Sequence, residues 1–148
     1  MKLGQELFAI KLYEMEQQYG KLQSKVEICG QQNHKRIREE LQKAKEEYRE
    51  HALMLQKSVA GSRSPAVSAL AKAQLESSSK MEELLQSGRL KQLLHSEKNS
   101  RAEDQTEAAT LYAEYAMDYA AQAVQYSSVA ALSAIDLQMC AAEAAGQR

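Results

Sequence analysis

The sequence has few of the residues that interrupt helices or build large aromatic cores. Of its 148 residues, one is proline and six are glycine; tryptophan is absent and phenylalanine occurs once. A chain with so few helix breakers can form long helices, and its small number of β-branched residues argues against strands. With 44% hydrophobic and 26% charged residues, the composition is that of a folded protein whose core is aliphatic, alanine and tyrosine.

The sequence also lacks a surplus of either charge. Nineteen Lys and Arg residues stand against 20 Asp and Glu residues, for a formal net charge of −1. Because a protein that binds nucleic acid through phosphate contacts carries a basic surplus, we expect no nucleic-acid partner. Glu39 and Glu40 directly follow the only basic cluster, residues 33–38. We therefore interpret the cluster as a solvated helix face, with a docking site for an acidic partner as the alternative.

Motifs for catalysis and metal binding are missing as well. No Glu stands three positions before His34, His51 or His95, and there is no C-x-x-C pair and no glycine-rich phosphate loop. Glu47 and His51 have helical spacing, but nothing completes a metal shell, so we interpret His51 as a half-buried core histidine. The sequence predicts a protein that is not an enzyme, with no cofactor and no small-molecule substrate. A ligand- or metal-binding helical bundle is the alternative.

The chain has only two cysteines, Cys29 and Cys140. Both fall on apolar helix positions, so we interpret them as buried thiols in a reducing compartment rather than as a disulfide framework. Glu6 and Lys11 stand where a secretory signal peptide would be apolar. The sequence therefore predicts a cytoplasmic protein, and export without a signal peptide stays open as an alternative.

No hydrophobic run is long enough to favour a membrane span. The longest uncharged run, residues 119–135, has 17 residues and includes two Gln and three Ser. A spanning helix needs about 20 mostly apolar residues. We therefore expect no membrane span.

What the sequence does contain is heptad spacing of apolar residues through its first 57 positions. From Phe8 to Leu55 the positions of this stripe, which include the polar Asn33 and His51, follow one another at steps of three and four, with an extra step of four after Cys29. The pattern predicts a helix over about 4–57 that is either continuous or bent near Gly30. The start of this stripe is a candidate interface with a partner or with a second copy: Phe8, Leu12, Met15, Tyr19 and Leu22.

A turn is expected at 58–64 and a second helix at 65–86. Ser64 is predicted to cap this helix, with Pro65 at its first position. Its apolar stripe is expected to comprise Val67, Leu70, Gln74, Ser77, Met81 and Leu84. Gly88 either bends or ends the helix, and leucines predict a continuation over 89–98.

The last helix is predicted to run from 101 to about 145. Ser100 and Glu103 form a capping box at its start, and Gly146 is a natural stop. One side of the helix alternates large residues with alanine, which predicts a coiled-coil-like core seam. The seam comprises Tyr112, Ala116, Tyr119, Ala123, Tyr126, Ala130 and Leu137. A ligand slot lined by tyrosine is the alternative.

We therefore expect an all-α fold in a single domain, residues 1–148. It would be an elongated antiparallel bundle of three long helices, or of four if the first bends near Gly30. Straight helices of these lengths would measure ~80, ~50 and ~68 Å, so the first would overhang the others by ~30 Å. The predicted function is that of a helical protein–protein interaction module, such as a scaffold, adaptor or chaperone-like partner. A homodimer is slightly favoured over a monomer.

The helix–turn–helix beginning is similar in shape to the small helical-hairpin substrates and accessory proteins of type VII secretion. That resemblance implies an export-associated helical protein as an alternative function. The chain departs from the family's motifs, however. Val59, Ala60 and Gly61 replace Trp-x-Gly in the turn, and no tyrosine is followed four residues later by Asp or Glu.

Overall fold

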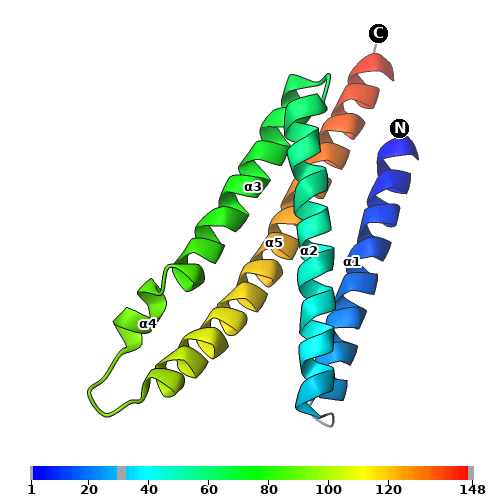
Figure 1. The fold of residues 1–148 in the computed structure, drawn as a ribbon. Helices are drawn as coiled ribbons and strands as arrows, with labels where there is room; N and C mark the ends of the chain where they lie inside the picture. Colours follow the sequence, from blue (N-terminus) through cyan, green and yellow to red (C-terminus); the bar gives the residue numbers. More distant parts are fainter. Residues whose placement is uncertain (1, 30–32, 147–148) are drawn as a thin grey trace. The chain divides into compact units, whose positions relative to one another are not determined.

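The computed structural model describes residues 2–29 and 33–146 (Figure 1). These residues contain five helices and no strand, which confirms the all-α prediction. In chain order the helices are α1 (Lys2–Cys29), α2 (His34–Gly61), α3 (Pro65–Gln86), α4 (Arg89–Leu94) and α5 (Arg101–Gly146).

The first predicted helix is divided in two. α1 ends at Cys29, Asn33 lies outside any helix, and α2 begins at His34. Of the two alternatives that the sequence left open, a continuous helix or one bent near Gly30, the structure has an interruption, although Gly30 itself lies outside the described residues. α2 also continues past the predicted end at residue 57, to Gly61.

The chain divides into two compact units. One comprises residues 34–115, and the other comprises residues 1–33 together with 116–148. The long helix α5 contributes its first part to one unit and its second part to the other. The single domain expected from the sequence stays a prediction.

Within the unit 34–115, α2 and α3 lie side by side as a helical hairpin (Figure 1). Ser64 caps α3 as predicted: the Val67 backbone N–H donates to its Oγ at 3.4 Å, and Pro65 occupies the first turn. The Ser68 hydroxyl then donates to the Val59 carbonyl at 2.8 Å across the turn. These bonds satisfy polar groups that the helix ends leave open.

The face of α3 that packs in this unit coincides only in part with the predicted one. Val67 and Leu70 are 49% and 72% exposed, whereas Ala71 is only 7% exposed. The buried and half-buried residues of α3 are Ser68, Ala71, Leu75, Ser77, Ser78, Met81, Glu82 and Leu85. Ser77 and Met81 among them belong to the predicted stripe. Small side chains let two helix backbones approach closely, so this face packs although the neighbouring one is more apolar. On α2 the predicted stripe residues Ala44 and Leu55 are half-buried, as is Ala52, whereas His51, expected to be half-buried, is exposed.

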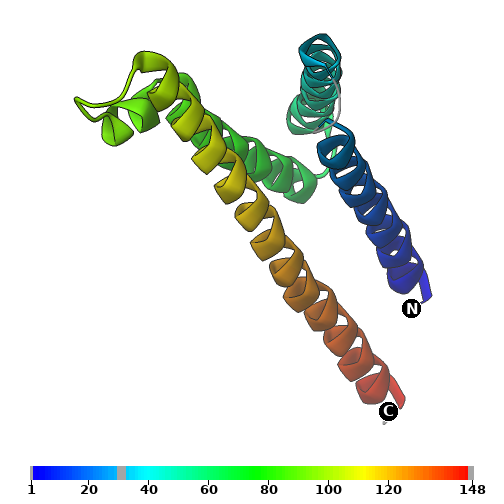
Figure 2. The same ribbon diagram turned by 90° about the horizontal axis from the view of Figure 1, so that it is seen from below.

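Gly88 ends α3 rather than bending it. Its φ of 74° is left-handed, a conformation that suits glycine, and α4 begins directly after it. α4 ends at Leu94, four residues before the predicted end at 98. In Figure 2 the chain turns back through α4 and the following loop into the start of α5.

In the unit of residues 1–33 and 116–148, no described residue is buried. α1 exposes large apolar side chains along its length, including Ile10 at 57% and Tyr19 at 66%. The second part of α5 does the same, with Tyr126 at 73% and Leu137 at 68%. Each of these two helices therefore presents apolar surface that the described chain does not cover.

Candidate functional site

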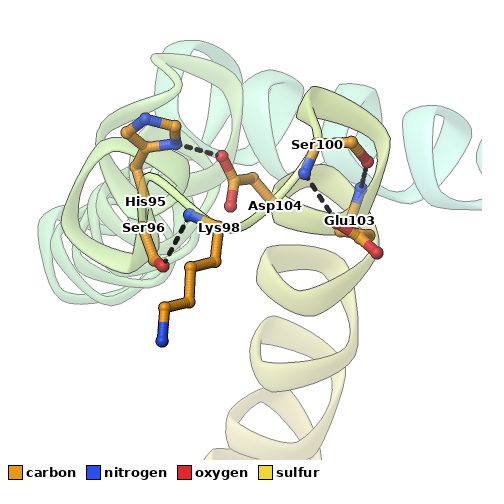
Figure 3. Close-up of polar contacts among 6 residues, drawn as sticks. All are labelled: His95, Ser96, Lys98, Ser100, Glu103 and Asp104. Carbon is orange, nitrogen blue, oxygen red and sulfur yellow. Dashed lines mark hydrogen bonds and ion pairs between the residues drawn. The ribbon is translucent and has the colours of Figure 1, made fainter.

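The loop between α4 and α5 is held by a capping box at the start of α5 (Figure 3). The Ser100 backbone N–H donates to Glu103 Oε2 at 2.6 Å, and the Glu103 N–H donates back to Ser100 Oγ at 3.2 Å. The reciprocal pair is the one predicted from the sequence, and it satisfies two of the open donors at the helix start. It fixes the direction in which α5 leaves the loop.

Asp104 lies one residue further along and joins this loop to α5. Its Oδ2 lies 2.5 Å from His95 Nδ1 (Figure 3). The Asp104 side chain is 8% exposed and that of His95 is 59% exposed. The other oxygen, Asp104 Oδ1, is enclosed and has no hydrogen-bond partner. The most specific polar feature of this unit is the buried Asp104 carboxylate. Its bond to His95 holds together the corner between α4 and α5.

An open hollow of about 480 Å³ lies beside this pair. It is lined by Gly88, Lys91, Gln92, His95, Arg101 and Asp104. The lining offers cations and an imidazole but no serine, threonine or cysteine that could act as a nucleophile. Nor do the described residues contain a group of three or more His, Cys, Asp or Glu side chains that could hold a metal ion. We interpret this corner as a structural joint between α4 and α5.

The sequence did not indicate the bond between His95 and Asp104. The two residues are nine positions apart across an irregular loop, so no helical spacing relates them. In the sequence His95 stands out only as a possible metal ligand, and nothing marks Asp104 as its partner. No sequence pattern relates His95 to Asp104, because the geometry of the loop, and not helical periodicity, brings the two side chains together.

A second polar cluster connects α2, α3 and the start of α5. The Tyr48 hydroxyl donates to Glu82 Oε1. This bond, followed by burial, raises the pKa of Tyr48 above its ordinary value of 10.0. Burial, followed by the negative charge of Glu82, likewise raises the pKa of Tyr112. Tyr112, at the start of the predicted α5 seam, is half-buried in this unit.

The predicted interface on α1 lies along one exposed helix. Phe8 is half-buried, and the other four residues are exposed: Leu12 at 60%, Met15 at 37%, Tyr19 at 66% and Leu22 at 44%. The structure thus places these side chains where a partner could reach them. Their role as an interface stays a prediction.

The predicted core seam of α5 is exposed from residue 116 onward. Ala116, Ala123 and Ala130 are exposed, as are Tyr119 at 47%, Tyr126 at 73% and Leu137 at 68%. The prediction that Cys140 is a buried thiol is wrong: it is free and exposed, because no described residue covers this part of α5. The side chain of Cys29 lies outside the described residues.

By length and composition, α5 is also the one described helix that could cross a membrane. Its most apolar stretch has a mean hydropathy of 1.2 and is not buried. A single helix of this kind is weak evidence, since helices of soluble proteins pass the same test. The expectation that the chain does not span a membrane stays a prediction.

The chain matches no protein-family model, and no curated protein and no solved structure is significantly similar to it. Its function is therefore argued from its own residues.

Proposed function

We propose that this chain is a non-enzymatic helical interaction protein, a scaffold, adaptor or chaperone-like partner. It would bind another protein through α1 and through residues 116–146 of α5. The observation that carries the proposal is the row of exposed large apolar side chains on both helices, from Leu7 at 53% to Val26 at 57% on α1 and from Met117 at 49% to Met139 at 56% on α5.

The energetics favour a partner for these helices. Each large apolar side chain gains roughly 2 kcal/mol when it moves from water into an apolar contact. Helices in water owe most of their stability to the packing of an apolar face rather than to intrinsic propensity. Covering even three or four of the exposed side chains on α1 would therefore contribute as much as the usual free-energy margin of a small domain, about 5–15 kcal/mol.

The chemistry of the other surfaces supports the same proposal. The hollow at the α4–α5 corner is lined by no serine, threonine or cysteine, and we interpret the His95–Asp104 bond there as structural. The exposed free thiol of Cys140 suits a reducing compartment, so a cytoplasmic location belongs to the proposal.

Site-specific photo-crosslinking tests the proposal in the cells that produce the chain. A photoreactive phenylalanine analogue replaces Leu12 in one variant and Tyr126 in another, both more than half exposed. The control carries the analogue at Ser128, which is exposed on the same helix as Tyr126 but on the opposite side from the seam. We expect discrete protein adducts from Leu12 or Tyr126 and none from Ser128. Absence of adducts from both positions would contradict the proposal.

A further inference from the structure

We propose that the partner of the α5 seam is a second copy of this chain, with the two α5 helices antiparallel over residues 116–146. The inference rests on the proposed function and deepens it by naming the partner. Both the partner and the antiparallel orientation follow from the order of side chains along α5.

The seam consists of two lines of residues that run along the same side of the helix. One line contains the aromatic residues of the exposed part and continues with small ones: Tyr119, Tyr126, Ser133 and Cys140. The other line is almost entirely alanine: Ala116, Ala123, Ala130, Leu137 and Ala144. The two lines alternate at steps of three and four, as the two core positions of a heptad do.

The orientation of a helix pair decides which residues meet across it. In a parallel pair each line faces its own copy, so Tyr126 would meet Tyr126 and Ala123 would meet Ala123. Such a pair would alternate overpacked layers with cavities, and each kind of layer costs about 1–3 kcal/mol. In an antiparallel pair each line faces the other line, whatever the heptad register. No tyrosine then meets a tyrosine. Over residues 116–146, Tyr119 faces Ala144 and Tyr126 faces Leu137, while Ser133 and Cys140 face Ala130 and Ala123.

Under the two-fold symmetry of an ordinary dimer, the α5 seam therefore pairs with itself without a tyrosine–tyrosine layer. Small residues on both helices also let the axes approach to the short end of the usual 8–10 Å range. That approach brings the tyrosine rings into contact with the facing backbone.

The charge pattern of α5 also favours a second copy of this chain as the partner of the seam. Between Asp118 and Asp136 the helix has no charged side chain, so a partner whose facing side is uncharged suits this ~25 Å stretch. A second α5 meets that requirement. α1 meets it less well, because charged residues recur along it, among them the Lys11–Glu14 ion pair at 3.5 Å. A bilayer is a poorer match than either, because the uncharged run is shorter than a span and contains two Gln and three Ser.

The area is sufficient for a specific dimer. Residues 116–146 form about 46 Å of helix, and a helix with side chains is about 10–12 Å wide. A pair covering one face over that length would occlude a strip of about 500 Å² on each copy, or about 1,000 Å² in total, the lower bound for a specific interface.

The first test is light scattering coupled to size exclusion across a concentration series of the full chain. We expect the mass to rise from 16.5 kDa to twice that value. In one variant Ala123 and Ala130 on the seam become glutamate (Ala123→Glu, Ala130→Glu). In the matched control Ala121 and Ser128 on the opposite side change in the same way (Ala121→Glu, Ser128→Glu). All four positions are exposed in the single chain, and both variants gain the same charge.

We expect the seam variant to dissociate at least about 100-fold more readily and the control to match the parent within about three-fold, because only the seam glutamates would be desolvated in the dimer. Helix content by circular dichroism should be the same in both variants. A monomer at every concentration, or equal effects of the two variants, would overturn the proposal.

The second test measures orientation. With Cys29→Ser, Cys140 is the only remaining thiol and is exposed for a spin label. An antiparallel pair that overlaps over residues 116–146 places the two Cys140 positions about 27 Å apart, or further in shorter overlaps. A parallel pair places them at the same height, within disulfide reach. A short label distance, or rapid formation of a Cys140 disulfide dimer, would overturn the antiparallel arrangement.

These results separate the inference from the proposed function. If the chain stays monomeric while the photoreactive group at position 126 captures a different protein, self-pairing is overturned and the interaction function stands. If the chain instead floats with uncharged phosphatidylcholine vesicles through α5, self-pairing is overturned in favour of a membrane.

Discussion

Removing the His95 imidazole should destabilise the α4–α5 corner more than removing both members of the His95–Asp104 pair. In His95→Ala, the Asp104 carboxylate stays 8% exposed and loses the partner of Oδ2, while Oδ1 already has none. Leaving a buried polar group unpaired costs about 1–3 kcal/mol. Because His95 is more than half exposed and water can partly replace it, we expect the free energy of unfolding to fall by about 2 kcal/mol.

The double variant His95→Ala, Asp104→Ala should lose less, about 1 kcal/mol, because the unpaired carboxylate disappears with its partner. Asp104→Ala alone should lie close to the double variant. Urea unfolding followed by circular dichroism gives the four free energies of the cycle. Lys98→Ala is the matched control, since only its backbone N–H bonds within the loop, to Ser96 Oγ at 3.2 Å. A double variant less stable than His95→Ala would refute the reasoning.

Three further predictions concern the stability of the folded chain. The folded-state pKa values of Tyr48 and Tyr112 are raised, so both tyrosines ionise at higher pH in the folded chain than in the unfolded one. The free energy of unfolding should therefore hold below pH 10 and fall as the pH rises above it, and thermal melts of Tyr48→Phe should show a shallower fall. Gly88→Ala should cost about 1–2 kcal/mol of unfolding free energy, since φ is 74°, whereas Gly20→Ala, in open space within α1, should stabilise its helix by about 0.5–1 kcal/mol. Ser64→Ala should cost about 1 kcal/mol by removing the α3 cap, and an unchanged urea midpoint would contradict that.

Local signals in the sequence were sufficient for the starts of α3 and α5 and for the end of α5. Ser64 with Pro65, and Ser100 with Glu103, predicted two helix starts that the structure has, because capping depends on residues within one turn. Gly146 likewise lies at the end of α5, as predicted.

The packed faces were harder to predict, because they depend on which other helix is near. On α3 the more apolar face, with Leu70, is exposed, and the face with Ala71 is packed. Counting apolar residues favours the first face, whereas close approach of two backbones needs the second. The α5 seam shows the same limit: heptad spacing predicts that a helix binds there, but not whether that helix belongs to this chain.

The most direct measurement is amide hydrogen exchange along α5 at about 1 and about 100 µM chain, read by mass spectrometry. If the seam pairs with a second copy, peptides from residues 116–146 should exchange more slowly at the higher concentration, while peptides from α3 should be unchanged. Exchange of residues 116–146 that is equally fast at both concentrations would contradict self-pairing of the seam.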